Sequence, residues 1–352
     1  MTGAINMHGG SDSVRKLRFL GFLETRRPHA ERGTVLSGEP DWSGVVRDVL
    51  YFPEYDCLYD GEGRRIVESC LRRGGKLAIE SRGPERVDVP TECRLVTDPL
   101  VYVGSLGHRH WGHLLTEGIA RLHVLKNIPE RSPFRALYHG PAPSLMWGHV
   151  RAFLNYCGIE PDALVRFDEP VRLSEVLLPM PSMVNGSHIF NVHAFCAGLV
   201  SSRIAGRDSG PASDQPVYLS RRKLAGAQRR ISREAELESI LATKGHRIVY
   251  PEEISFEDQV RLFNSHKTFT GCIGSAFHSV LFAREDTNVS TVVFARETVG
   301  VNYLMIDKIK STSATYIKCL EDDESSAKES TFRDQVLDID VALFHLRLMG
   351  IL

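Results

Sequence analysis

After residue 216 the chain alternates short apolar strands with amphipathic helices, and this rhythm restricts the folds open to it. Strands are predicted at 217–220, 246–250, 267–271 and 290–295, with helical periodicity between the first three. Parallel strands need crossover connections of this kind, usually helices. The region therefore predicts an α/β domain built on a βαβαβ series, closed by a helix on which Val336, Ile339, Leu343 and Leu346 keep helical spacing.

Local signals mark the ends of the predicted helices. Ser232 is placed to cap the first helix, and Gly245 is placed to end it. Ser255 and Asp258 have the spacing of a capping box at the start of the second helix. The acidic, serine-rich segment 321–330 is interpreted as a solvated loop.

The first half of the chain has a similar alternation. Apolar runs at 48–52, 94–104, 134–140, 163–167 and 174–179 surround helical-period segments at 112–127 and 144–157. They predict a second α/β domain with a largely parallel sheet. Residues 206–216 combine Gly, Pro, Ser and Asp, which is typical of an exposed connection. The 352 residues therefore divide into a first domain at 1–205, a linker at 206–216 and a second domain at 217–352.

The charge balance narrows the possible partners. A formal net charge of -1 provides no general basic field, so nucleic acid is not expected as the main partner. The seven cysteines are widely spaced, and residues 1–19 lack the apolar stretch of a secretory signal. We expect reduced thiols and a cytoplasmic location. The basic segment 14–19 leaves peripheral membrane association open, and no pattern indicates the oligomeric state.

The first candidate cluster lies in residues 107–125. If a helix begins near Gly112, then His113, Glu117 and Arg121 share one face. A base, a carboxylate and a guanidinium together can perform acid/base chemistry, but the same spacing is typical of a solvated face with stabilising ion pairs. His108, His110 and His113 also form HxHxxH. No Cys, Asp or Glu adds a recurrent ligand spacing, so no metal site is expected.

Two further clusters follow predicted strands. Arg221, Arg222, Arg229 and Arg230 follow the strand at 217–220, where guanidinium groups can bind phosphate oxygens at the carboxyl edge of a sheet. The alternative is a basic surface loop. Gly271 and Gly274 lie in a strand-to-helix turn that lets backbone N–H groups approach a ligand. That turn lacks the full GxGxxG pattern, and a close-packed turn is the competing explanation.

Taken together and in this order, the three clusters resemble glycosyltransferase family 61, which includes bacterial polysaccharide enzymes and eukaryotic xylosyl- and N-acetylglucosaminyltransferases. HWGHLLTEGIARL at 110–122 is similar to the family pattern NYGHWLLEGLPRL, and YLSRRKLAGAQRRI and PEEISFEDQV match later family segments. The last family motif resembles GPHGAGLTN. Here Ile273 stands in place of its usual histidine, and His278 follows five residues later.

The resemblance implies a GT-B fold, with two Rossmann-like domains facing a central cleft, and inverting transfer from a nucleotide sugar to a hydroxyl acceptor in polysaccharide or glycoconjugate synthesis. It implies a UDP-sugar donor, no other cofactor and no required metal, with the donor bound by the C-terminal half. His113 or Glu117 would be the base, and which of them is left open. The implied donor-binding residues are Arg221, Arg222, Gly271, Gly274, Ser275 and His278, and the supporting residues are Arg121, Ser220 and Glu253. Because of Ile273, a non-catalytic sugar- or nucleotide-binding relative remains the alternative.

Overall fold

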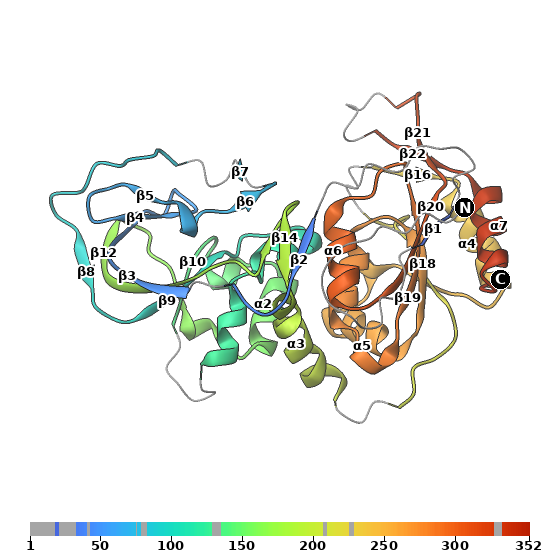
Figure 1. Cartoon of the computed structure of the whole chain (residues 1–352), viewed down its shortest axis with the longest axis horizontal. Coiled ribbons are helices and arrows are strands. Elements are labelled where there is room, and N and C mark those ends of the chain that lie inside the picture. The colour runs from blue at the N-terminus through green and yellow to red at the C-terminus, as the bar shows by residue number, and fades with distance from the viewer. Residues whose placement is uncertain are drawn as a thin grey trace. The chain divides into compact units, whose positions relative to one another are not determined.

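The computed structural model describes residues 18–20, 33–40, 43–74, 76–78, 83–128, 135–206, 210–224, 229–326 and 333–352. The chain separates into two compact units. The first unit spans residues 31–204, and the second combines residues 205–352 with residues 1–30. Strand β1 (Arg18–Leu20) belongs to the sheet of the second unit, whereas the sequence placed residues 1–205 together in the first domain. The two units are coloured along the chain in Figure 1.

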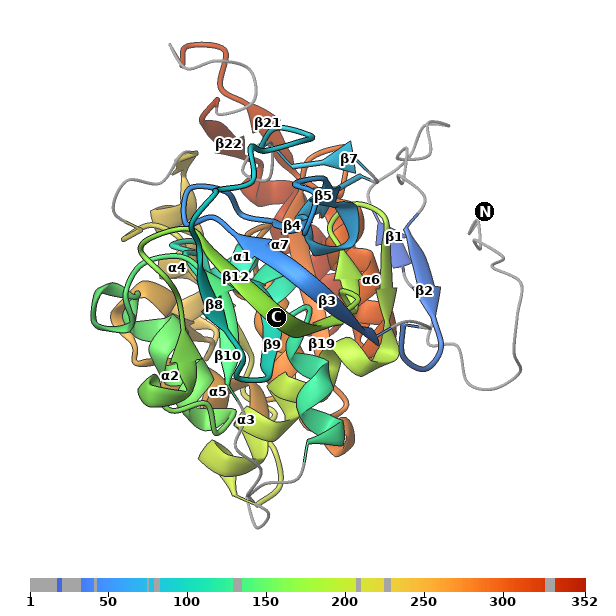
Figure 2. The same cartoon turned by 90° about the vertical axis from the view of Figure 1, so that its left-hand side faces the viewer.

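The first unit is built on a mixed sheet. Its strand order is β11-β10-β9-β12-β3-β4-β5, and β8 also pairs with β12. The bounds are β3 (Ser43–Tyr51), β4 (Leu58–Asp60), β5 (Arg65–Ile66), β8 (Arg94–Val96), β9 (Leu100–Ser105), β10 (Ala136–His139), β11 (Leu164–Val165) and β12 (Val171–Pro179). The neighbours from β11 to β12 are parallel, but β3, β4 and β5 continue the sheet antiparallel. The expected largely parallel sheet is therefore only partly correct. Figure 2 looks onto this unit, with β12 and β3 side by side.

Short elements complete the first unit. A small sheet joins β13 (Met183–Val184), β14 (His188–Phe190) and β2 (Thr34–Leu36), and a hairpin joins β6 (Arg72–Arg73) to β7 (Lys76–Leu77). Its longer helices are α2 (Gly148–Tyr156) and α3 (Phe195–Ala205), and its short helical turns are η1 (Val67–Ser69), η5 (Pro143–Leu145), η6 (Pro161–Ala163) and η7 (Asn191–Ala194).

The predicted helix at 112–127 is not continuous. It consists of α1 (Trp111–His113), a π-helical turn η3 (Leu114–Gly118) and the 3₁₀ segment η4 (Leu122–Asn127). In the π turn the Ile119 N–H donates to the Leu114 carbonyl at 3.0 Å. Periodicity alone cannot reveal such a bulge, because it changes the spacing by one residue within an otherwise apolar segment.

The second unit has a six-stranded parallel sheet in the order β1-β20-β19-β18-β15-β17. The bounds are β15 (Val217–Leu219), β17 (Arg247–Val249), β18 (Thr268–Cys272), β19 (Ser290–Ala295) and β20 (Ser313–Lys318). The parallel strands and their helical crossovers confirm the α/β class predicted for this region. A small sheet of β16 (Ile231–Ser232), β22 (Gln335–Leu337) and β21 (Leu320–Asp322) lies beside it.

Helices cover both faces of the second unit's sheet (Figure 1). On one face, α4 (Glu234–Thr243) and α7 (Ile339–Leu348) pack Leu237, Leu241 and Leu346 into a buried cluster. On the other face lie α5 (Phe256–Ser265), α6 (Val301–Ile309) and η9 (Ser275–Phe282). The short turns η8 (Pro251–Glu253) and η10 (Glu285–Thr287) complete the unit.

The cap predictions had mixed outcomes. The Asp258 N–H donates to Ser255 Oγ at 3.0 Å, and Gly245 follows α4 with φ +84°, so both of these signals are confirmed. Ser232 does not cap α4: it lies in β16, its hydroxyl donates to the Gln335 carbonyl, and Arg233 is the N-cap. Strand pairing with β22 overrides the local capping preference. Likewise Glu321 and Asp322 lie in β21 rather than in a loop.

No helix in the described part of the chain is long and apolar enough to cross a membrane.

Candidate functional site

In the first unit, the Glu117 carboxylate is enclosed by three hydrogen-bonding side chains. Arg73 contacts it with Nε at 2.5 Å and Nη2 at 2.8 Å, Asn185 Nδ2 lies 2.7 Å away, and His113 Nδ1 lies 3.0 Å away. Burial alone would raise the pKa of Glu117, but these hydrogen bonds lower that pKa well below its usual range. Glu117 is therefore a carboxylate at neutral pH, and a weak proton acceptor.

His113 is hydrogen-bonded to Glu117 but is much more exposed to solvent. Its Nδ1 faces the Glu117 carboxylate, as the predicted i,i+4 spacing requires, and 42% of its side chain is exposed compared with 1% for Glu117. If Nδ1 carries the proton donated to Glu117, the lone pair lies on Nε2. The ring stacks near His108, with centroids 6.3 Å apart. This arrangement suits a base that is oriented by a carboxylate.

Close contacts between segments that are far apart in the sequence assemble this site. Gly118 leaves room for His108, because an added Cβ would lie 2.9 Å from His108 Cδ2. The hairpin carrying Arg73 is held at Asn185, whose carbonyl accepts the Gly74 N–H at 2.7 Å. Arg73 and Asn185 are 44 and 68 residues from Glu117, so sequence spacing could not have identified them.

Arg121 does not join His113 and Glu117. The broken helix turns its buried guanidinium to the carbonyls of Pro179 and Glu68. The guanidinium also lies over the Tyr102 ring, 5.5 Å from its centroid. The predicted shared face of three residues is therefore wrong for Arg121, which joins separate segments of the first unit. A narrow hollow of about 30 Å³ next to it is also lined by Glu117 and His108.

In the second unit, Arg221 lies at the carboxyl end of β15, as predicted. Its Nη1 donates to the Ile273 carbonyl at 2.6 Å, and its N–H donates to Glu234 Oε1 at 3.0 Å. Gly274 allows this approach, because an added Cβ would lie 3.2 Å from both Cδ and Nε of Arg221. The arginine and the glycine turn, separate in sequence, therefore form one surface. Ser275 begins η9 directly after that turn.

Arg222 has a different role from Arg221. Its Nε donates to Glu238 Oε2 at 3.0 Å, and its Nη2 donates to the Tyr250 hydroxyl at 3.0 Å. Ser220 also donates to Glu238. Ser220 and Arg222 thus belong to a network that holds the end of β15. Glu253 pairs with Lys223 at 2.8 Å, and the Lys223 ammonium lies over the ring of Tyr250 in the same network.

Arg229, a member of the predicted arginine cluster, lies near Arg221 and also near Arg296, which no sequence pattern indicated. Burial lowers the pKa of Arg229, and the positive charges of Arg296 and Arg221 lower that pKa further. Arg296 follows β19 and pairs with Asp322 at 3.3 Å. Three guanidinium groups, those of Arg221, Arg229 and Arg296, therefore lie at the carboxyl edge of the sheet. Such a cluster suits a polyanionic ligand.

His278 and Tyr303 lie in the same region. Their rings are 4.4 Å apart and His278 is buried. Burial raises the pKa of Tyr303 to about 12, although the charges of Arg221 and Arg229 oppose the rise. The two rings are held on η9 and α6, next to the arginine cluster.

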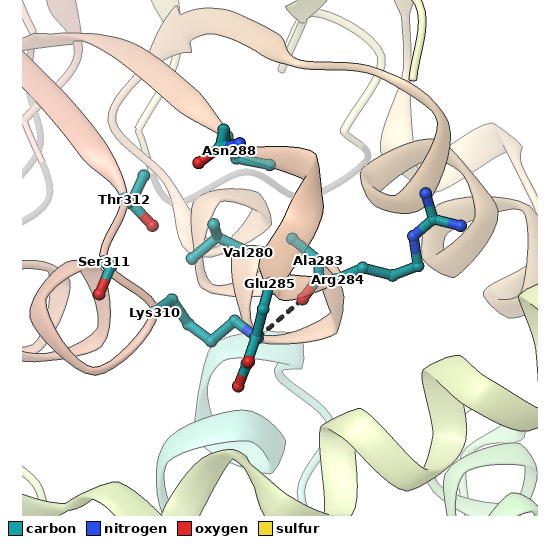
Figure 3. A pocket seen from close by; sticks show the side chains of 9 residues that line it. Val280, Ala283, Arg284, Glu285, Asn288, Lys310, Ser311 and Thr312 are labelled. Carbon is teal, nitrogen blue, oxygen red and sulfur yellow. Dashed lines mark hydrogen bonds between the residues drawn. The ribbon is translucent and has the colours of Figure 1, made fainter. Parts of the chain in front are cut away.

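A larger hollow of the second unit, with a volume of about 190 Å³, is lined by Lys310, Thr312 and Asn288 among others (Figure 3). Lys310 donates to the Ala283 carbonyl at 2.7 Å across its floor. Thr312 and Val289 precede β20 and β19, so this hollow lies at the amino ends of the strands. None of the predicted site residues lines it. Within the described residues, no group of three or more His, Cys, Asp or Glu could hold a metal ion.

Comparison with known families identifies one match. Residues 111–290 fit the family model Glycosyltransferase 61, which covers just over half of the chain. The matched range includes His113, Glu117, Arg221 and the turn at 271–275, whereas Arg73 lies before it and Arg296 after it. No curated protein matches the sequence.

Proposed function

The chain belongs to glycosyltransferase family 61, and on that premise we propose that it is an inverting enzyme that transfers a sugar from a nucleotide-sugar donor to a hydroxyl group of a glycan or other acceptor. Family membership implies glycosyltransferase activity with a sugar donor and an acceptor. The observation that carries the mechanism is the pairing of a half-exposed His113 with the buried, ionised Glu117.

His113 is the proposed base. The acceptor hydroxyl transfers its proton to Nε2 of His113 while its oxygen bonds to the anomeric carbon from the face opposite the leaving group. Glu117 accepts the Nδ1 hydrogen bond and stabilises the imidazolium that forms, as carboxylates do in related dyads. Glu117 is disfavoured as the base, because Arg73, Asn185 and His113 hold its oxygens.

The departing diphosphate takes the electron pair of the broken bond between the anomeric carbon and oxygen. Arg221, Arg229 and Arg296 supply positive charge at the carboxyl edge of the second unit's sheet. Gly274 and Ser275, at the start of η9, add backbone N–H groups next to Arg221. Fixed guanidinium groups can neutralise a diphosphate without a divalent cation, so we propose metal-independent transfer from a UDP-sugar.

The parallel sheet with arginines at its carboxyl edge supports the second unit as the donor-binding half of a GT-B enzyme. The His113 site supports the first unit as the acceptor half. We also propose that the protein acts in the cytoplasm, in polysaccharide or glycoconjugate synthesis.

The test combines nucleotide binding with turnover. UDP, GDP, CMP, ADP and dTDP are screened by thermal shift with and without magnesium, and the matching donor sugars are assayed for hydrolysis and transfer. His113→Ala and Glu117→Gln should each lower turnover by about 10²- to 10⁴-fold and leave nucleotide binding intact. Arg221→Ala should weaken nucleotide binding about tenfold, whereas Arg261→Ala, an exposed arginine on α5, should not.

Two results would overturn the proposal. Wild-type turnover by the three site variants would remove the residue assignments. If the wild type binds a nucleotide tightly but neither hydrolyses nor transfers any sugar, the protein is the non-catalytic binding relative that Ile273 suggests.

A further inference from the structure

We propose that Trp147 and Arg109 form an acceptor subsite for an acidic sugar, next to His113 in the first unit. The inference deepens the proposed transferase function and rests on it, because the bound sugar is an acceptor only if the protein is a transferase. The site lies on the loops that follow β9 and β10.

These two loops lie together at one sheet edge. β9 and β10 are parallel neighbours that end at Ser105 and His139, and the Leu106 N–H donates to the His139 carbonyl at 2.9 Å. The loops then touch through glycines, because a Cβ added to Gly140 would lie 3.1 Å from the Gly107 nitrogen. Ligands of parallel sheets bind at this carboxyl edge.

The two loops carry the residues of the proposed subsite. The loop after β9 contains Arg109 and leads into α1, which ends at His113. The loop after β10 contains Trp147, the N-cap residue of α2. The Arg109 guanidinium lies over the Trp147 ring, 5.2 Å from its centroid. A cation four residues before the proposed base is thus joined to an aromatic ring from the neighbouring loop.

Trp147 is exposed and its backbone is fixed. The residue is 46% exposed, yet its carbonyl accepts the N–H groups of Val150 at 3.0 Å and Arg151 at 3.1 Å, and the preceding Met146 is buried. An aromatic side chain on a fixed backbone has only two rotatable bonds to immobilise, so it loses little conformational entropy when a ligand covers it. The C–H face of a pyranose ring can pack on such an apolar aromatic surface.

The charge around Trp147 favours an anionic sugar. Residues 105–116 and 140–157 contain no Asp or Glu, but they include Arg109 and Arg151. The nearby Glu117 carboxylate is already engaged by Arg73. Among the described residues Arg109 forms no ion pair, and its guanidinium contacts the Trp147 indole. A carboxylate on the sugar would provide the bidentate partner that a guanidinium prefers.

The test measures glycan binding without donor or turnover, so it stands even if the transfer reaction fails. The probes are a tetrasaccharide that alternates glucuronic acid with N-acetylglucosamine and the same tetrasaccharide after reduction of its carboxyl groups. Binding to the full chain is followed by saturation-transfer NMR and by tryptophan fluorescence. We expect the acidic probe to bind at least about tenfold more tightly than the reduced one.

Three variants separate the contributions. Trp147→Ala should abolish binding of both probes, and Arg109→Gln should remove the preference for the acidic probe. Leu145→Ala is the matched control, because this leucine lies on the same loop, is 74% exposed and should change neither affinity. Circular dichroism of each variant checks that the fold is kept. Equal binding of the two probes, unchanged binding by folded Trp147→Ala, or no binding of the acidic probe to the wild type would each overturn the subsite.

Discussion

Replacing Asp307 by asparagine should make the protein more stable at pH 8 than the wild type. Asp307 lies on α6 and is buried, and its Oδ2 accepts a hydrogen bond from the Tyr316 hydroxyl at 2.5 Å. Burial raises the pKa of Asp307 to about 7, because a single hydroxyl partner compensates poorly for the lost hydration of a carboxylate. An asparagine carbonyl can accept the same hydrogen bond without ionising.

The sign and size of the effect follow from proton linkage. The native state binds this proton more tightly than the unfolded state, so the stabilisation is complete below the unfolded pKa near 3.8 and is lost as the pH rises through about 7. Multiplying that pKa difference by 1.36 kcal/mol per unit gives about 4 kcal/mol in full. About 3 kcal/mol of this should develop between pH 5 and pH 8. Asp307→Asn should remove the pH-dependent loss.

The assay is urea unfolding of wild type and Asp307→Asn at four pH values from 5 to 8, followed by a signal from the second unit. Comparing the two proteins at each pH cancels the titration of all other groups. Asp340→Asn, an exposed aspartate on α7, is the control and should show no pH-dependent difference. A constant difference between Asp307→Asn and wild type across this range, or a wild type that is more stable at pH 8, would refute the reasoning.

Two further predictions concern backbone contacts. Gly274→Ala should keep the fold but weaken nucleotide binding several-fold in calorimetry, because the added Cβ would displace Arg221. Gly271→Ala should instead lower the thermal midpoint of unfolding. Its φ is +155°, and the added Cβ would lie 2.6 Å from the Leu219 carbonyl oxygen. Arg121→Met should destabilise the first unit by about 3 kcal/mol in urea unfolding, because two carbonyls lose their charged donor, and a variant as stable as wild type would contradict this.

Fold features fixed by neighbouring residues could be predicted from sequence. The helix α5 begins where Ser255 and Asp258 predict it, because both partners of the cap lie within one turn. Ser232 carries an equally good local signal, yet it forms a strand with residues about a hundred positions away. The antiparallel half of the first sheet was missed for the same reason: an apolar run does not reveal the direction of its neighbour.

In the candidate site, too, local spacing predicts some contacts, whereas contacts between distant segments could not be predicted. The contact between His113 and Glu117 follows from i,i+4 spacing and was predicted. The side chains that hold Glu117 in its ionised form come from a hairpin and from the turn between β13 and β14, and no spacing rule connects those segments. The choice between His113 and Glu117 therefore depended on tertiary contacts. Arg121 was misassigned because one π turn rotates its side chain away.

The departure at Ile273 bears on whether the donor site is intact. The Ile273 carbonyl accepts the Arg221 guanidinium, and its N–H donates to the Phe294 carbonyl at 2.8 Å. Its side chain packs against the hydrophobic cluster of the second unit. A backbone carbonyl can position Arg221 whichever side chain stands at this residue, so the substitution does not remove the contact. The loss is limited to the imidazole, and the buried His278 ring lies on the next helix, η9, with its centroid 4.4 Å from that of Tyr303. The exchange at residue 273 therefore leaves the position of Arg221 unchanged and removes only the imidazole from the turn.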